Sequence, residues 1–314
     1  MADQARKVVV DVNDGIATLT IDRPKALNAL NGAVVADLEA AFDEAVARPD
    51  VKALVIQGAG DKAFVAGADI KFFIDNIEAD RVGDIVAFAR RGQKVLRKIE
   101  KSPKPVIAKV DGLALGGGLE LALACTAIVV TDKAGVGLPE TGIGIFPGLG
   151  GTQRTARVVG KELGKYLVFT GQILDGKTAH EIGLAGYLAA DDVDGFIRDL
   201  VARGEFRDKY APKPTPAGWE PVVEAFSDAH VQEVLAGTAP NDDPRVAAAV
   251  KAVGRKAPLA LKVANRIIDE GFQKSLDDAL ELELANLGEI FSTQDALVGL
   301  KSVIEKSRPA FKGE

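Results

Sequence analysis

Hydrophobic residues in the first part of the chain recur in short runs that alternate between two spacings. Residues 8–21, "VVVDVNDGIATLTI", contain two β-type runs separated by the turn "NDG", which predicts a hairpin. Residues 32–47 carry apolar side chains at helical spacing, and residues 51–58, "VKALVIQG", form a short apolar run that ends in glycine. The pattern therefore predicts a hairpin, then a helix, then a buried strand.

The alternation continues to about residue 131. Residues 90–102 fit a helix, 104–112 a strand, 118–126 a short helix and 127–131 another strand. Repeated strand and helix units of this kind predict a layered α/β core whose strands are buried on both faces.

The pattern changes after about residue 200. Residues 210–221, "YAPKPTPAGWEP", are rich in proline and glycine and indicate a boundary or an irregular insert. Residues 258–272, 275–291 and 293–307 are helical in pattern, with Ser275 and Thr293 as expected N-caps. The expected division is 1–200 for the core with the active site, 201–256 for an insert or linker, and 257–314 for a C-terminal helical region.

Composition and charge narrow the class of protein. The chain has 314 residues, 47% of them hydrophobic, which is enough for a large core. The net charge of -6 argues against a nucleic-acid or anionic membrane partner, since both favour basic surfaces. The apolar stretch 106–130 is interrupted by Lys109, Asp111 and Glu120, so no membrane span is expected.

Cysteine usage and the N-terminal stretch point to one compartment. The single cysteine, Cys125, excludes an intrachain disulfide and suits the reducing cytoplasm. Its apolar neighbours predict a small buried side chain rather than a nucleophile. The first ten residues carry no apolar segment typical of a secretion signal. We therefore expect a cytoplasmic protein.

Residues 112–151 hold 11 glycines in 40 positions. The segment "GIGIFPG" has Pro147 where a dinucleotide fingerprint needs its last glycine, and no P-loop sequence occurs. The two histidines, His180 and His230, are far apart and match neither a metal motif nor a Ser-His-Asp hydrolase, so no metal or cofactor is expected. Glycines at the start of a short helix leave free N–H groups that favour an anion.

Two acids stand out in this glycine-rich region. Glu120, in "GGGLELALAC", has no polar helix face to share, so its side chain must enter a cavity or remain a simple helix-start acid. Glu140 follows 20 residues later in the apolar loop "GLPETGIGIFPGLGG". Two carboxylates that face one cavity can hold a water molecule and share acid and base duties.

The sequence resembles the crotonase superfamily, and among its members most closely the enoyl-CoA hydratases. The match rests on residues 62–71, 104–125 and 137–160, with weaker blocks at 23–30 and 291–313. It is close over 8–200 and good over about 257–314. The resemblance implies a spiral of ββα units followed by a helical trimerisation region, and assembly as a homotrimer or a dimer of trimers.

The resemblance also implies roles for individual residues. The backbone N–H groups of Ala68 and Gly117 would polarise a thioester carbonyl as an oxyanion hole. Glu120 would take a proton from water as hydroxide adds at Cβ, and Glu140 would supply the proton at Cα. Coenzyme A enters as part of the acyl-CoA substrate, not as a cofactor. Its implied contacts are Lys25, Ala26, Leu27, Ala66, Asp69, Ile70, Gly116, Pro139 and Lys306, with Asp69 fixing the loop that presents Ala68.

Three rivals to hydration remain open. The extra residues around 201–256 and the phrase "PETGIGIFPG" also resemble 3-hydroxyisobutyryl-CoA hydrolases, but that branch has an aspartate after "FP" where this chain has Gly148. A glycine cannot perform that chemistry. An enoyl-CoA isomerase often keeps only one of the two acids. A non-catalytic or RNA-binding member of the fold is disfavoured by the intact acids and the acidic pI of about 5.2. Acyl length and branching are not readable from the sequence.

Overall fold

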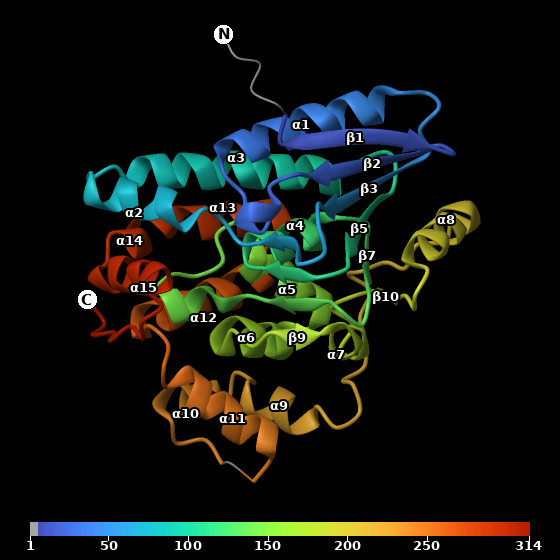
Figure 1. Cartoon of the computed structure of the whole chain (residues 1–314). Coiled ribbons are helices and arrows are strands. Elements are labelled where there is room, and N and C mark those ends of the chain that lie inside the picture. The colour runs from blue at the N-terminus through green and yellow to red at the C-terminus, as the bar shows by residue number, and fades with distance from the viewer. Residues whose placement is uncertain (1–5, 241) are drawn as a thin grey trace.

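The computed structural model describes residues 6–240 and 242–314 and arranges them as two β-sheets surrounded by helices (Figure 1). Half of the N-terminal stretch on which the absence of a secretion signal was expected, residues 1–5, lies outside the described residues. Within the described part, no helix is both long and apolar enough to cross a membrane.

The expected hairpin is present at the edge of the larger sheet. Strands β1 (Val8–Asn13) and β2 (Ile16–Ile21) pair antiparallel. Asp14 and Gly15 join them with φ values of 50° and 79°, as a two-residue hairpin turn requires. Helix α1 (Gly32–Ala47) then begins at Asn31, whose side chain accepts a hydrogen bond from the Val34 N–H.

Three successive turns of chain build the two sheets together. Each turn gives its first strand to the larger sheet, of order β1-β2-β3-β5-β7-β10, and its second strand to the smaller sheet, of order β4-β6-β8-β9. This arrangement confirms the expected spiral of ββα units. The first turn consists of β3 (Ala53–Gly58), β4 (Ala63–Ala66), α2 (Ile70–Glu78) and α3 (Val82–Glu100). The second consists of β5 (Val106–Val110), β6 (Leu113–Leu115) and α4 (Gly117–Ala124). The third consists of β7 (Ala127–Val130), β8 (Gly135–Gly137), the 3-10 helix η2 (Pro139–Ile143) and α5 (Gly151–Val159).

The strands of the larger sheet are buried on both faces, as the apolar runs predict. In β3, Leu54 and Ile56 point into the main core, and Val55 points to the opposite face. That second face is covered by α8 (Val193–Arg203) through apolar side chains such as Ile197. Successive residues of one strand therefore serve two separate apolar clusters.

The region 201–256 is only partly irregular. Residues 204–219 form no regular helix, in agreement with their proline content, but α9 (Glu220–Ala225), α10 (Val231–Ala236) and α11 (Pro244–Val253) follow and form the lower lobe in Figure 1. These helices exist because apolar residues such as Val222, Val234 and Val246 are buried against one another and the core. The lobe packs against α6 (Lys161–Thr170). Between α6 and α8 the chain forms β9 (Leu174–Asp175), α7 (Gly176–Glu181) and β10 (Tyr187–Leu188). The division of the chain near residues 200 and 257 stays a prediction.

The C-terminal region is helical as expected, with one difference. It comprises α12 (Pro258–Phe272), α13 (Leu276–Ala285), α14 (Leu287–Phe291) and α15 (Gln294–Glu305). Ser275 and Thr293 cap α13 and α15 by accepting hydrogen bonds from N–H groups in the first turn, which confirms both expected caps. The expected helix 275–291 is divided at Asn286, whose side chain bonds to the Leu282 carbonyl and to Arg266.

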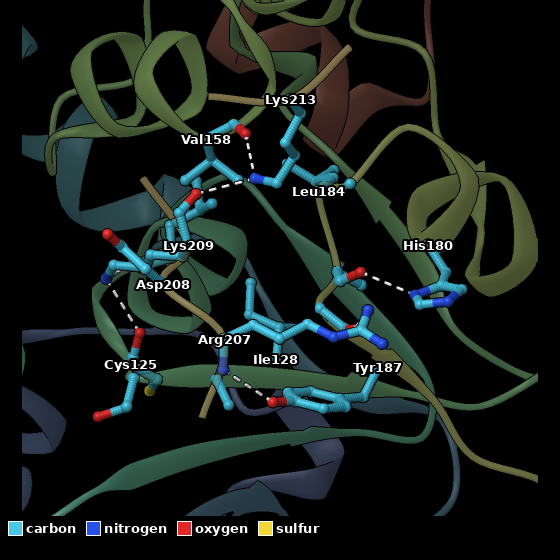
Figure 2. Close-up of a pocket in the computed structure, with 16 residues that line it drawn as sticks. Cys125, Ile128, Val158, His180, Leu184, Tyr187, Arg207, Asp208, Lys209 and Lys213 are labelled. Carbon is cyan, nitrogen blue, oxygen red and sulfur yellow. Dashed lines mark hydrogen bonds between the residues drawn. The ribbon is translucent and has the colours of Figure 1, made fainter. Parts of the chain in front are cut away.

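Residues 207–213, within the irregular segment 204–219, are held against the core by hydrogen bonds, and we call them the strap. Lys209 Nζ donates to the carbonyls of Leu123 (2.6 Å) and Cys125 (3.0 Å) at the end of α4, and Lys213 Nζ donates to Val158 O (2.6 Å) near the end of α5. A cation at a helix C-terminus also opposes the negative end of the helix dipole. Figure 2 shows the bonds from Lys213 to Val158 and from Lys209 to Cys125 around a cavity of about 270 Å³ between the strap and β7.

Candidate active site

One cavity of about 330 Å³ collects most of the residues singled out in the sequence. It lies between the ends of β4 and β6, the start of α4 and the turn η2, with α2, α3 and α14 on its apolar side. The predicted site residues that line it are Ala66, Ala68, Ile70, Gly116, Gly117, Glu120, Pro139 and Glu140. Segments far apart in the sequence thus meet at one end of the smaller sheet.

Two backbone N–H groups are free at the mouth of this cavity. β4 and β6 are parallel neighbours, with Ala66 opposite Leu115, so the residues that follow them lie side by side. Within the described residues, the N–H groups of Ala68 and Gly117 donate to no acceptor, whereas the N–H of Gly116 donates to Gly137 O at 2.9 Å. Both N–H groups are thus left available at neighbouring strand ends, and their service as an oxyanion hole stays a prediction.

Gly116 is required by the local geometry. Its φ of 51° belongs to the region that L-residues rarely adopt, and a Cβ at this position would collide with Glu140 Oε1. The glycine therefore brings the backbone of α4 against the carboxylate of Glu140.

Glu120 is almost fully buried, with 2% of its surface exposed. Its Oε1 accepts hydrogen bonds from the N–H groups of Leu149 and Gly151, each at 2.7 Å. A Cβ at Gly151 would stand 2.7 Å from the same oxygen, so only glycine allows this approach. Burial raises the pKa of Glu120 to about 7, against the opposing effect of the two N–H bonds.

Glu140 faces the same cavity from η2 and is 8% exposed. Its Oε2 is buried and, among the described residues, has no hydrogen-bond partner. Burial, together with the charge of Glu120, raises the pKa of Glu140 well above its ordinary value. Burial therefore favours the protonated form of both acids in this cavity.

Behind Glu120 lies a third buried glutamate that the sequence analysis missed. Glu283 on α13 is 0% exposed and accepts hydrogen bonds from the N–H groups of Gly150 and Thr152. We call residues 148–152 the N–H loop, since they donate to both Glu120 and Glu283. A signal was present in the sequence: Glu283 lies three residues after Leu280 and four before Leu287, on the apolar face of its helix.

A buried ion cluster supports the N–H loop from the other side. Arg154 Nη1 donates to Leu149 O at 3.0 Å, and its Nη2 lies 3.1 Å from Glu100 Oε2. Glu100 also accepts a hydrogen bond from the hydroxyl of Tyr210 and forms an ion pair with Lys209 at 3.2 Å. The strap thus reaches the loop beside Glu120 through Glu100 and Arg154.

The remaining predicted CoA contacts are dispersed. Lys25 and Leu27, next to Ala26 in and after the 3-10 helix η1 (Pro24–Ala26), line a separate cleft. Asp69 lies 3.5 Å from Arg23 and precedes α2, so its side chain ties the loop after Ala68 to the N-terminal segment. Lys306 follows α15 and is exposed. Their binding of CoA stays a prediction.

The far end of the main cavity is apolar. Phe73 lies between Phe88 and Phe291, with ring centroids 6.1 and 5.1 Å from theirs, and Leu287 completes this wall. Such a wall suits an acyl chain, whereas the polar atoms gather at the opposite end near Glu120 and Glu140.

Comparison with known proteins decides the family. The enoyl-CoA hydratase/isomerase family model matches residues 16–313. The chain belongs to the enoyl-CoA hydratase/isomerase family. Its relatives within the family include a crotonyl-CoA hydratase from Syntrophomonas wolfei, 33% identical over 97% of each chain, and a short-chain-enoyl-CoA hydratase from Clostridium acetobutylicum with the same identity and coverage.

Solved structures of enoyl-CoA hydratase/isomerase proteins agree in fold. An enoyl-CoA hydratase from Rhodobacter sphaeroides superimposes with a TM-score of 0.85 at 28% identity, covering 98% of this chain and 93% of that one. A carnitinyl-CoA dehydratase from Mycobacterium thermoresistibile gives 0.84 at 26% identity, over 97% and 91%. Membership of the family implies an acyl-CoA substrate. Relatives of the family include bacterial and mitochondrial proteins.

Proposed function

We propose that this chain hydrates 2-enoyl-CoA thioesters, adding water reversibly and in syn fashion to give 3-hydroxyacyl-CoA. The observation that carries the proposal is the convergence of two buried carboxylates, Glu120 and Glu140, with the free N–H groups of Ala68 and Gly117 in one cavity. The named activities of the relatives, crotonyl-CoA and short-chain-enoyl-CoA hydration, support the same reaction.

The geometry suggests how the reaction proceeds. The thioester oxygen lies between the two free N–H groups, which stabilise the negative charge that develops as water attacks. Glu120, with its pKa near 7, is able to accept a proton from the attacking water, and the hydroxide forms a bond to Cβ. Glu140, whose raised pKa keeps it protonated, donates its proton to Cα of the resulting enolate. The two proton transfers balance, and water returns the acids to their starting states.

Two alternatives are less well supported. Gly148 lines the cavity where the hydrolase branch has an aspartate, and a Cβ there would lie 2.8 Å from Leu287 Cδ2. The carboxylate that would perform that thioester hydrolysis is therefore not present at this position. Double-bond isomerisation requires only one proton carrier, so it does not account for the presence of both Glu120 and Glu140 in one cavity.

The proposed location rests on the single cysteine, and the proposed assembly rests on the family resemblance. We propose a cytoplasmic enzyme that acts in fatty-acid or branched or aromatic acid degradation as a homotrimer or a dimer of trimers. The acidic net charge of -6 supports a small-molecule substrate rather than nucleic acid or membrane.

The test is loss of the ultraviolet absorbance of the conjugated enoyl thioester when protein is added to crotonyl-CoA. We expect turnover in the wild type, and loss of turnover in Glu120→Gln and in Glu140→Gln. Glu281→Gln, which alters an exposed acid paired with Arg90, is the matched control and keeps full activity. Free thiol release from 3-hydroxyacyl thioesters, with no hydration, would instead establish a hydrolase, and turnover unaffected by both glutamine variants would refute the assigned roles.

A further inference from the structure

The N–H loop divides its backbone donors between two carboxylates. The N–H groups of Leu149 and Gly151 donate to Glu120 Oε1, both at 2.7 Å. The alternate N–H groups, of Gly150 and Thr152, donate to Glu283 at 2.6 and 3.2 Å. Odd-numbered donors therefore point toward the cavity, and even-numbered donors point away from it.

The surroundings of Glu283 supply donors to both of its oxygens. Its Oε1 accepts from Gly150 N–H and from Gln93 Nε2 at 2.8 Å. Its Oε2 accepts from the N–H and the hydroxyl of Thr152. Four donors satisfy two oxygens, so Glu283 has its full set of partners without any contact to substrate. Gln93 Nε2 also donates to Gly148 O at 3.0 Å, which joins the start of the loop to the same centre.

We propose that Glu283 is a positioning residue that holds the even-numbered half of the N–H loop and thereby keeps the odd-numbered half directed at Glu120. Because neighbouring peptide planes share a Cα, displacement of Gly150 or Thr152 rotates the donors on either side. The inference rests on the proposed hydration, in which Glu120 is the base. The proposal thus places Glu283, on α13 in the C-terminal region, among the residues that support the active site of the spiral.

Electrostatics agree with this arrangement. Burial raises the pKa of Glu283 to about 8, and the charge of Glu120 adds to the rise, while the bonds from Thr152 and Gly150 and the charge of Arg154 oppose it. The two carboxylates repel each other across the loop, and the backbone N–H groups between them offset that repulsion. Glu140, on η2, also has its pKa raised by Glu283.

The decisive variant is Glu283→Gln, which keeps the side-chain shape but places an amide N–H₂ against the donors of the loop. We expect kcat for crotonyl-CoA hydration to fall on the order of 100-fold, because small displacements of a catalytic group have effects of this size. We expect KM to stay unchanged, since Glu283 is not among the described residues that line the cavity.

Amide hydrogen exchange supplies a readout that does not require turnover. In Glu283→Gln the N–H groups of Leu149 and Gly151 should exchange faster than in the wild type, while Glu281→Gln on the same helix leaves them unchanged. If the wild type does not hydrate enoyl-CoA, the proposed function fails, yet faster exchange still supports the positioning role. Unchanged kcat together with unchanged exchange in a folded Glu283→Gln variant would overturn the positioning role.

A milder variant covers the case in which Glu283→Gln does not fold. Thr152→Val removes the hydroxyl that donates to Glu283 and keeps both the carboxylate and the backbone N–H of position 152. We expect a smaller fall in kcat, the same KM, and faster exchange at Gly151. Wild-type kcat and exchange in this variant would also count against the proposal.

Discussion

Replacing Glu120 by glutamine should abolish turnover and at the same time stabilise the protein above neutral pH. The neutral amide oxygen of the new side chain can still accept the N–H bonds from Leu149 and Gly151, so the loop keeps its contacts. What Glu120→Gln removes is a carboxylate that burial disfavours in its charged form. Activity and stability are therefore expected to move in opposite directions.

The size of the effect follows from the pKa. Folding raises the pKa of Glu120 from 4.5 to about 7, so between these pH values the folded protein retains a proton that the unfolded chain releases. Stability therefore falls as pH rises through this window, by about 1.4 kcal/mol per pH unit and about 3 kcal/mol in total for this group. The Glu120→Gln variant lacks this loss.

Denaturant unfolding at a series of pH values between about 5 and 8, which spans the raised pKa, measures the difference directly. We expect the free energy of unfolding of Glu120→Gln, relative to wild type, to increase up to about pH 7 and to level off above it. Glu281→Gln, exposed on α13, should follow the wild-type curve. Parallel curves for wild type and Glu120→Gln would show that the carboxylate is not buried in its charged form and would refute the reasoning.

Three further changes test other parts of the structure. Gly116→Ala forces a side chain into a conformation with φ of 51° and against Glu140. About 1–3 kcal/mol of stability should be lost, together with most of the activity. An active and stable variant would contradict the close approach of residue 116 to Glu140. Glu100 has its pKa lowered to about 2, since burial is outweighed by Arg154, Lys209 and the Tyr210 hydroxyl. Its contribution is present above pH 4.5 and lost as pH falls toward 2, so acid unfolding should be less steep in Glu100→Gln than in wild type. Lys209→Met removes two hydrogen bonds to carbonyls at the end of α4 and one of the cations that balance the charge of Glu100. The free energy of unfolding, measured by heat or denaturant, should fall by about 1–3 kcal/mol. An unchanged midpoint would show that this contact of the strap adds no stability.

The sequence predicted those features that depend on local pattern or on one dense motif. The hairpin, the spiral strands and the caps at Ser275 and Thr293 follow from side-chain spacing within a few residues. The cavity that joins Glu120 and Glu140 followed from the apolar surroundings of each acid, which exclude a solvated position.

Features that depend on contacts between residues far apart in the sequence could not be predicted from local pattern. Glu283 contacts Gly150 across 133 residues, and no local pattern identifies which loop a buried acid will meet. Lys25 and Leu27 line a different cleft from the one that holds Glu120 and Glu140, and their contact with CoA stays a prediction. The helices α9–α11 were not predicted, because the proline-rich stretch before them indicated an irregular segment.

The contacts of the strap and of Glu283 also bear on the order in which parts of the chain fold. Lys209 reaches back 86 residues to Leu123, and Glu283 reaches back 133 residues to Gly150. Such contacts close long loops and form late, whereas the helices and hairpin of the spiral rest on nearby residues. On a ribosome the spiral can acquire its secondary structure while the loop beside Glu120 still lacks its supports. We therefore expect catalytic competence to arise late in the folding of this chain, after the spiral has formed.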